Sequence, residues 1–305
     1  MLGYILKRGV QTLVVLFLTI TLVFFLIRLS GDPTYLYMPD DADEEMVEQF
    51  REQLGFNRPL IVQYGSFLND VVQGNFGESL MYRKDALGMV LAKVPATFQL
   101  AFAALFVAIA VAIPLGVISA YKQNTIYDRI GTGITVFGQA IPGFWLGLLL
   151  ILVFSVVFKV LPSGGGGSGL HLILPAVTLA AHSAARFARF TRSTMLDVLR
   201  KDYIRTVKST GASTFSILYK YALKNTLIPI ITIAALDLGV LLGGAVIIES
   251  VFSWPGLGQL LIKALMGRDF PVVIAGVFFI ALSISIINFF ADILYGLVNP
   301  QVRVK

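Results

Sequence analysis

Long runs of apolar residues that contain no charged side chain recur along the chain. Three of them occupy residues 9–27, 94–121 and 130–158. The hydrocarbon core of a bilayer is about 30 Å thick, and a helix needs roughly 20 apolar residues to cross it. Each run therefore predicts one membrane-spanning helix. The continuity of the runs argues against membrane barrel strands, in which apolar and polar residues alternate.

Three further spans are predicted in the C-terminal half. The segment 161–169 is rich in glycine and cannot form a lipid-exposed helix, so the fourth span is expected to begin near Leu170. Residues 225–248 and 270–298 are apolar apart from one aspartate each, and they predict the fifth and sixth spans. The sequence therefore predicts an all-α polytopic membrane protein with six transmembrane helices.

The composition agrees with this class of protein. Hydrophobic residues make up 56% of the chain and charged residues 14%, whereas soluble domains contain about 45–50% apolar and about 25% charged residues. The absence of cysteine excludes disulfides and thiolate metal sites, and it leaves the redox compartment open. No cluster of residues has the character of a metal site.

The distribution of charge predicts the orientation of the spans. If the N-terminus is inside, the inner segments hold more than half of the 24 Lys and Arg residues, whereas the loop 31–93 collects most of the acidic residues. Because basic loops stay on the cytoplasmic side, both termini are expected in the cytoplasm. The net charge of +6 then reflects topology and not nucleic-acid binding.

The predicted spans divide the chain into four parts. Residues 1–30 are expected to form the first transmembrane helix with a cytoplasmic N-terminus, and residues 31–93 an extracytoplasmic cap inserted before the second helix. Residues 94–298 are expected to form a five-helix core, and residues 299–305 a cytoplasmic tail.

The cap has its own apolar pattern. Met46, Val47, Phe50 and Leu54 fall on one face of a helix. This pattern favours a small folded unit, although a solvated acidic loop remains the alternative.

The inner connection between the fourth and fifth spans covers residues 197–225 and predicts a helix, a turn and a second helix. Gly211 supplies the left-handed conformation that ends many helices, and Ser213 or Thr214 is suited to cap the next helix. A short helix outside the membrane at such a corner is a rigid element that a soluble partner could grip.

The residues of this connection carry a family resemblance. The run Asp-Tyr-Ile-Arg-Thr-Val-Lys-Ser-Thr-Gly at 202–211, followed by Ala-Leu-Lys-Asn at 222–225 and by Pro229, resembles the ATPase-coupling loop of dipeptide and oligopeptide (peptide/nickel) ABC importers, specifically their first, B-type permease. Further similar segments lie at 31–33, 54–64, 74–79, 252–258, 268–271 and 292–300. The chain departs from the general importer loop at Val207, Tyr221 and Lys224, and the peptide subfamily often departs there too.

The resemblance implies a fold and a set of partners. The fold is the type I ABC importer transmembrane domain, forming half of a pathway for di- or oligopeptides or related small substrates. The implied partners are a second homologous permease, two cytoplasmic ATPases that bind ATP and Mg²⁺, and an extracytoplasmic substrate-binding protein, in a bacterial or archaeal cytoplasmic (inner) membrane. This chain lacks a phosphate-binding loop, so it is not expected to be an enzyme. The residues implied to couple to the ATPases are Asp202, Tyr203, Ile204, Arg205, Thr206, Gly211 and Ala212.

Polar residues inside the spans are candidates for the translocation path. A charge near the bilayer centre is costly, so Asp237 is expected to face either the path or a structural partner, such as a hydroxyl or lysine of the companion subunit. Asp292 lies near the inner end of its span, which favours a structural pairing. Gln139 and Pro142 mark a disrupted stretch that either lines the path or bends the helix for packing.

The loop between the fifth and sixth spans contains a second group of candidates. Glu249, Trp254, Pro255 and Gly256 lie at the expected outer surface. Anchoring of Trp254 at the membrane interface explains the aromatic residue, and a gate or partner contact is the alternative.

The remaining basic and ionisable residues suggest competing functions. His182 is expected to be a packed neutral imidazole, and Arg186, Arg189 and Arg192 are expected to anchor the membrane surface. A secondary transporter or channel without ATPases would instead use Asp237 and His182 as ion sites. An intramembrane hydrolase is disfavoured because no nucleophile motif such as Gly-x-Ser-x-Gly is present.

Overall fold

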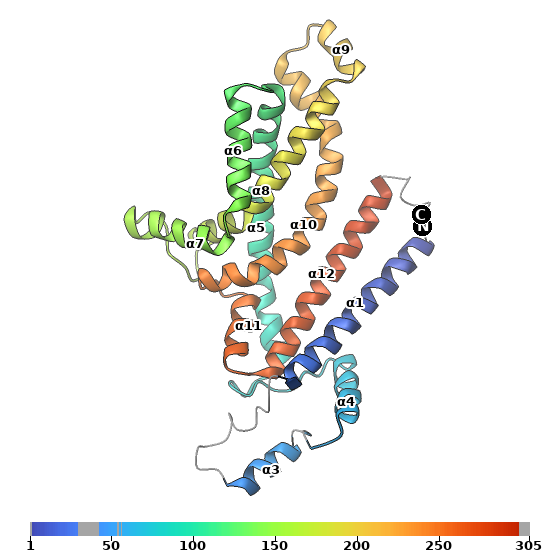
Figure 1. The fold of residues 1–305 in the computed structure, drawn as a ribbon, viewed down its shortest axis with the longest axis vertical. Coiled ribbons are helices and arrows are strands. Elements are labelled where there is room, and N and C mark those ends of the chain that lie inside the picture. Colours follow the sequence, from blue (N-terminus) through green and yellow to red (C-terminus); the bar gives the residue numbers. More distant parts are fainter. Residues whose placement is uncertain (1, 30–42, 54, 56, 299–305) are drawn as a thin grey trace.

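The computed structural model describes residues 2–29, 43–53, 55 and 57–298, and every regular element in these ranges is helical. The elements are α1 Leu2–Leu29, α3 Glu44–Gln53, α4 Leu60–Val72, α5 Ala86–Tyr121, α6 Ile126–Ala140, α7 Gly143–Leu150, the π-helical η1 Ile151–Val157, α8 Leu170–Leu199, α9 Asp202–Ser209, the π-helical η2 Ser216–Ala222, α10 Leu223–Val251, α11 Leu257–Met266 and α12 Phe270–Val298. Figure 1 places α9 at one end of the molecule and α3 and α4 at the other.

Five of the described helices are long and apolar enough to cross a membrane, namely those in α1, α5, α8, α10 and α12. A sixth span is formed if α6 and the following helix, residues 143–157, count as one. These two helices meet at an angle of 105°. Five of the six predicted spans are therefore present as single helices, and the third corresponds to a pair of helices that is bent at the proline that interrupted its sequence pattern.

The core lies where α5, α8 and α10 pack together. Alanines fill the face of α5 at 101, 104, 108 and 112, and all four are fully buried. A Cβ on Gly116 would lie 2.6 Å from Cβ of Thr191 on α8, so the two backbones approach too closely for a larger residue. Small side chains therefore allow the close contact of α5 and α8 that holds the centre of the protein.

Helix α1 lies along α12 at the side of this core (Figure 1). Only a narrow stripe of α1 is buried, at Leu16, Ile20 and Phe24. Near the start of α1 and the end of α12, Arg8 Nη1 lies 3.1 Å from Asp292 Oδ2. The structural pairing predicted for Asp292 is thus confirmed.

The segment between α1 and α5 packs on the C-terminal part of α1 through aromatic residues. The Tyr64 hydroxyl on α4 lies 2.7 Å from Thr21 Oγ1, and the rings of Phe24 and Phe67 are 5.1 Å apart. In α3, Val47 is buried and Met46 is exposed. Leu54, which the sequence places on the same face, lies outside the described residues.

Candidate functional site

The connection between α8 and α10 forms a short helix that projects beyond the long helices (Figure 1). Lys201 has extended backbone angles, φ −70° and ψ 147°, which separate α8 from α9. Helix α9 then runs for eight residues, Asp202–Ser209, at the tip of the molecule. The predicted helix–turn–helix is therefore present, with its first helix set apart from the spans.

One side chain anchors α9 to the rest of the protein. Ile204 is 1% exposed and packs with Val117 of α5, Met195 of α8 and Leu218 of η2. A second contact is polar, because the Asn225 side-chain amide donates to the Tyr203 hydroxyl at 2.7 Å. Ile204 thus positions the helix and does not present itself to a partner.

The opposite face of α9 is exposed. Asp202, Arg205 and Thr206 point to solvent, and the ion pair between Asp202 and Arg205 spans 3.7 Å. Such an exposed pair adds little stability. These side chains are therefore available to an incoming surface.

The turn after α9 has the predicted chemistry. Gly211 has φ +77°, a left-handed conformation that a β-carbon disfavours. Its built Cβ would meet no atom within 4 Å, so the constraint is one of conformation and not of space. Ser213 Oγ accepts a hydrogen bond from the Ser216 backbone N–H at 3.3 Å, which identifies Ser213 as the cap, and Ala212 packs against the cluster around Ile204.

The candidate pathway residues lie at the break in the third span. Gln139 occupies the last turn of α6, and Ile141 and Pro142 have extended backbone angles before α7 begins at Gly143. The Gln139 side-chain oxygen accepts a hydrogen bond from Arg189 of α8. The break therefore combines a change of direction with a polar contact between α6 and α8 on an exposed side of α8.

Asp237 is not an open pathway residue in this conformation. Its side chain is fully buried and forms an ion pair with Arg186 of α8. The structural partner expected as one alternative for Asp237 is therefore present, but the suggested hydroxyl or lysine of the companion subunit was wrong, because the partner is an arginine of the same chain. A buried carboxylate needs such a cation to offset its desolvation.

The expectation that the three arginines of α8 anchor the membrane surface was also wrong. Each arginine contacts another helix: Arg186 contacts Asp237, Arg189 contacts Gln139, and Arg192 contacts Asp128. Their three-residue spacing places them along one side of α8. They link α8 to α6 and α10.

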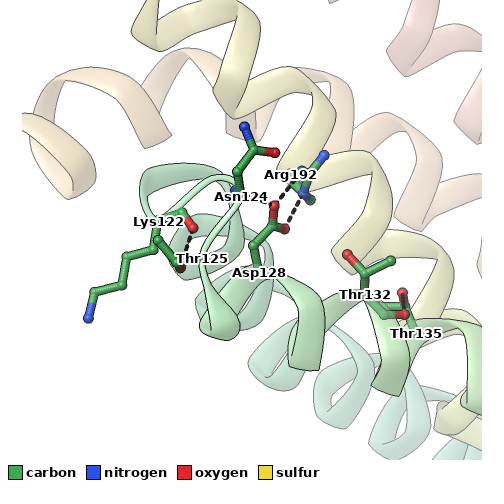
Figure 2. Close-up of polar contacts among 7 residues, drawn as sticks. All are labelled: Lys122, Asn124, Thr125, Asp128, Thr132, Thr135 and Arg192. Atoms are coloured by element: carbon green, nitrogen blue, oxygen red, sulfur yellow. Dashed lines mark hydrogen bonds and ion pairs between the residues drawn. The ribbon is translucent and has the colours of Figure 1, made fainter.

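Asp128, which the sequence analysis did not single out, forms the best-defined of these contacts. Figure 2 shows the Arg192 guanidinium facing this carboxylate, with Nε–Oδ1 and Nη2–Oδ2 distances of 2.7 Å. The backbone N–H of Asn124, a residue with φ +64°, donates to Asp128 Oδ2 at 3.0 Å. In the sequence, the only indication of this ion pair is one acidic residue, Asp128, together with a regular series of arginines at 186, 189 and 192.

His182 was expected to be packed, and the structure places it on an exposed position of α8. It lies one turn before Arg186 on the same side of the helix. The expectation of a packed imidazole was therefore wrong.

The loop between α10 and α12 is a packed connection. Glu249 is fully buried and accepts hydrogen bonds from Thr97 Oγ1 at 2.6 Å and from the Gly258 N–H at 2.6 Å. A Cβ on Gly256 would lie 2.3 Å from the Glu249 carboxylate, so only glycine fits there. Glu249 thus fastens the start of α11 to α5.

Trp254 belongs to the same packed group. It is 4% exposed, and its indole N–H donates to the Ala96 carbonyl at 2.9 Å. Its anchoring at a membrane interface, as expected from the sequence, is contradicted by this burial. Pro255 is half-buried beside Gly166 of the glycine-rich loop.

A second carboxylate, also not singled out from the sequence as a site, holds the segment before α5. Asp269, fully buried between α11 and α12, accepts hydrogen bonds from Ser79 Oγ and, at 3.1 Å, from the Leu80 N–H. Residues 190 positions apart are thus joined.

The chain belongs to the family of binding-protein-dependent transport system inner membrane components, whose description matches residues 112–304. The N-terminal membrane component of the same systems matches residues 1–101. The protein is therefore the permease subunit of an ABC importer, a multi-pass inner membrane protein that works with ATPase partners and is not itself the catalyst. No support remains for a transporter or channel that works without ATPases.

Individual relatives cover the whole chain. The glutathione transport system permease protein GsiC of Escherichia coli strain K12 is 39% identical over 306 residues, 100% of both chains. The protein of that name from Pectobacterium atrosepticum is 38% identical over the same length. Two inward-facing crystal forms of the MetNI methionine ABC transporter, 21% and 20% identical, share the fold with TM-scores of 0.59 and 0.55, and each comparison covers 69% of this chain and 96% of the other.

Proposed function

We propose that this chain forms half of a translocation pathway together with a second homologous permease. An extracytoplasmic binding protein would deliver the cargo, as the description of the family as binding-protein-dependent supports. The proposed cargo class is small peptides and peptide-like molecules such as glutathione. It is supported by relatives that match over their full length and are named as glutathione transport system permeases. Both termini would lie in the cytoplasm of a bacterium or archaeon.

The proposed organisation follows the sequence boundaries. Residues 1–30 form the first span, 31–93 the extracytoplasmic cap, 94–298 the core with its coupling segment 197–225, and 299–305 the inner tail. The separation of α9 from α3 and α4 at opposite ends of the molecule supports this arrangement (Figure 1). The clustering of Lys and Arg in the inner loops supports the orientation.

Within this organisation, α9 is the element that the ATPases grip. The observation that carries the proposal is a short helix at the tip of the molecule with one buried anchor, Ile204, and an exposed face at Asp202, Arg205 and Thr206. A push on this face would pass into α8, because Lys201 directly joins the two helices. Closure of the ATPases would thereby switch the pathway between outward and inward access.

The pathway itself is proposed to run past the break at Gln139 and Pro142. Asp237 would hold Arg186 in place beside it through their ion pair. Glu249, Trp254 and Gly256 would act as the rigid outer corner of the path. Their burial supports a fixed corner over a mobile gate.

The turn at Gly211 offers a test of coupling. Gly211→Val places a β-branched residue at φ +77°, whereas Gly211→Asn places there a residue that tolerates this conformation. Each variant is assembled with the second permease, the ATPases and the binding protein, and ATP-dependent uptake is compared with ATP hydrolysis. We expect Gly211→Val to abolish uptake or assembly and Gly211→Asn to retain most of both.

The opposite result is decisive as well. If Gly211→Val leaves assembly and ATP-dependent uptake unchanged, the segment 197–225 is not the coupling element. Uptake by this chain in vesicles without ATPases would also contradict the proposal.

A further inference from the structure

The C-terminal half of α8 has a cationic face. Positions 182, 186, 189 and 193 follow one another at spacings of three or four residues, so they lie on one side of the helix. His182, Arg189 and Ser193 are exposed, and Arg186 is half-buried among them.

Arg186, in the middle of this face, lies at membrane depth. Arg186 pairs with Asp237, and Asp237 is eight residues into the apolar span of α10 that begins at Pro229. At 1.5 Å per residue this is about 12 Å from the start of the span. Charged side chains at such depth avoid lipid and face protein or a water-filled path.

The three arginines of this region differ in the charge of their partners. Arg186 is paired with the carboxylate of Asp237, and Arg192 with that of Asp128. Arg189 donates a hydrogen bond to the neutral side-chain oxygen of Gln139. Among the residues that the structure describes, this is its side-chain hydrogen-bond partner. The positive charge of Arg189 is therefore not balanced by a carboxylate there.

We propose that Arg189 binds a carboxylate of the cargo as the cargo passes the break between α6 and α7. This inference rests on the proposed function, since it needs the exposed face of α8 to border the pathway. A guanidinium has five N–H donors in a fork that matches a carboxylate, and only part of them is engaged by Gln139.

The flanking pairs explain why the site is confined to one residue. Arg186 and Arg192 are each held by an internal carboxylate, which lowers their tendency to capture an anion. Gln139 holds Arg189 by a weaker, neutral contact that an incoming carboxylate can displace. The cargo carboxylate can therefore bind to Arg189 alone. It is not held by all three arginines at once, which would slow its release.

The test uses the complete transporter in vesicles, with the second permease, the ATPases and the binding protein. The probes are S-methylglutathione, which carries two carboxylates, and its dimethyl ester, which carries none. Each uptake rate is divided by that of the wild type for the same probe, so that the preference of the binding protein cancels. Assembly and ATP hydrolysis are measured for every variant.

Two substitutions separate the charge of Arg189 from its packing. Arg189→Gln removes the charge, and Gln139→Glu keeps the arginine but supplies an internal carboxylate that competes with the cargo. Both are expected to lower S-methylglutathione uptake about tenfold to a hundredfold relative to the ester. Arg129→Gln, an exposed residue of α6 with the same charge change, is expected to affect both probes equally and little.

A second measurement does not depend on uptake. The chain has no cysteine, so Arg189→Cys introduces its only thiol. A water-soluble, negatively charged thiosulfonate is expected to label this variant, and S-methylglutathione to slow the labelling. Phe106→Cys, at an exposed apolar position of α5, is the control that should remain unlabelled.

The outcomes are distinguishable. Equal loss of both probes in Arg189→Gln, or no effect of Gln139→Glu, would overturn the role of Arg189. A loss that depends on anionic lipid in the vesicles would mean that Arg189 holds a lipid phosphate, which also overturns it. Absence of ATP-dependent uptake of either probe by the wild type would count against the proposed cargo class, whereas labelling of Arg189→Cys without S-methylglutathione reports only on whether position 189 is open to a water-soluble anion.

Discussion

Arg192 of α8 and Asp128 of α6 form a bidentate ion pair, in which two nitrogens of one guanidinium donate to the two oxygens of one carboxylate at 2.7 Å (Figure 2). The Asp128 side chain is 7% exposed and that of Arg192 is 28% exposed. Because α8 leads directly into α9, this clamp joins the helix that receives a push to the first half of the broken span. Helices α6 and α8 are therefore expected to move together.

We predict that this ion pair stabilises the packing of α6 against α8 by about 1.5–3 kcal/mol, the range for hydrogen bonds to charged groups. Arg192→Gln or Asp128→Asn alone should lower the melting temperature of the purified complex, since each leaves one buried charge unpaired. The double variant should be less destabilised than the sum, because two neutral amides can bond to each other. Additive losses in this double-mutant cycle would show that the two residues do not act as a pair.

The outer corner makes a second prediction. Gly256→Ala should destabilise the protein strongly, because the new Cβ would fall 2.3 Å from the Glu249 carboxylate. Glu249→Ala should also destabilise it, since the buried N–H of Gly258 and hydroxyl of Thr97 lose their acceptor.

The combination of these two changes provides the control. Removing the carboxylate removes the steric conflict. The double variant should therefore have nearly the same stability as Glu249→Ala, with a further loss of at most about 1 kcal/mol, the usual scale of a single substitution. The measurement is the melting temperature of each variant in detergent. Full additivity would mean that Gly256 is required for another reason.

A third prediction concerns the anchor of α9. Ile204→Ala removes buried side-chain volume, which typically costs about 2–5 kcal/mol in a packed core. Because Ile204 is the one buried residue of α9, the loss should loosen this helix more than the spans. We expect ATP hydrolysis to continue while the amount of cargo taken up per ATP falls.

The matched control lies on the same helix. Ser209 is exposed, and its hydroxyl donates only to the Arg205 carbonyl at 3.1 Å. Ser209→Ala should leave the uptake per ATP unchanged. An unchanged ratio in Ile204→Ala as well would contradict the role of this residue as the anchor.

The sequence by itself determined the properties that depend on neighbouring residues. Run length decided which segments are long enough to span a bilayer, because hydrophobic transfer depends on the composition of the segment alone. The turn at Gly211 followed from local backbone chemistry, and so did the location of the break at Pro142. Ser213 was one of two possible caps, and the structure selects it.

Tertiary structure decided which polar groups meet. Asp237 and Arg186 are 51 positions apart, and Asp128 and Arg192 are 64 apart, so their pairing depends on how α6 and α10 pack against α8. The burial of Trp254 and Glu249 likewise depends on contacts with α5. The sequence thus identified the membrane spans and the residue types that must avoid lipid, whereas only packing could select their partners, because ion pairs and hydrogen bonds require atoms brought together from distant parts of the chain.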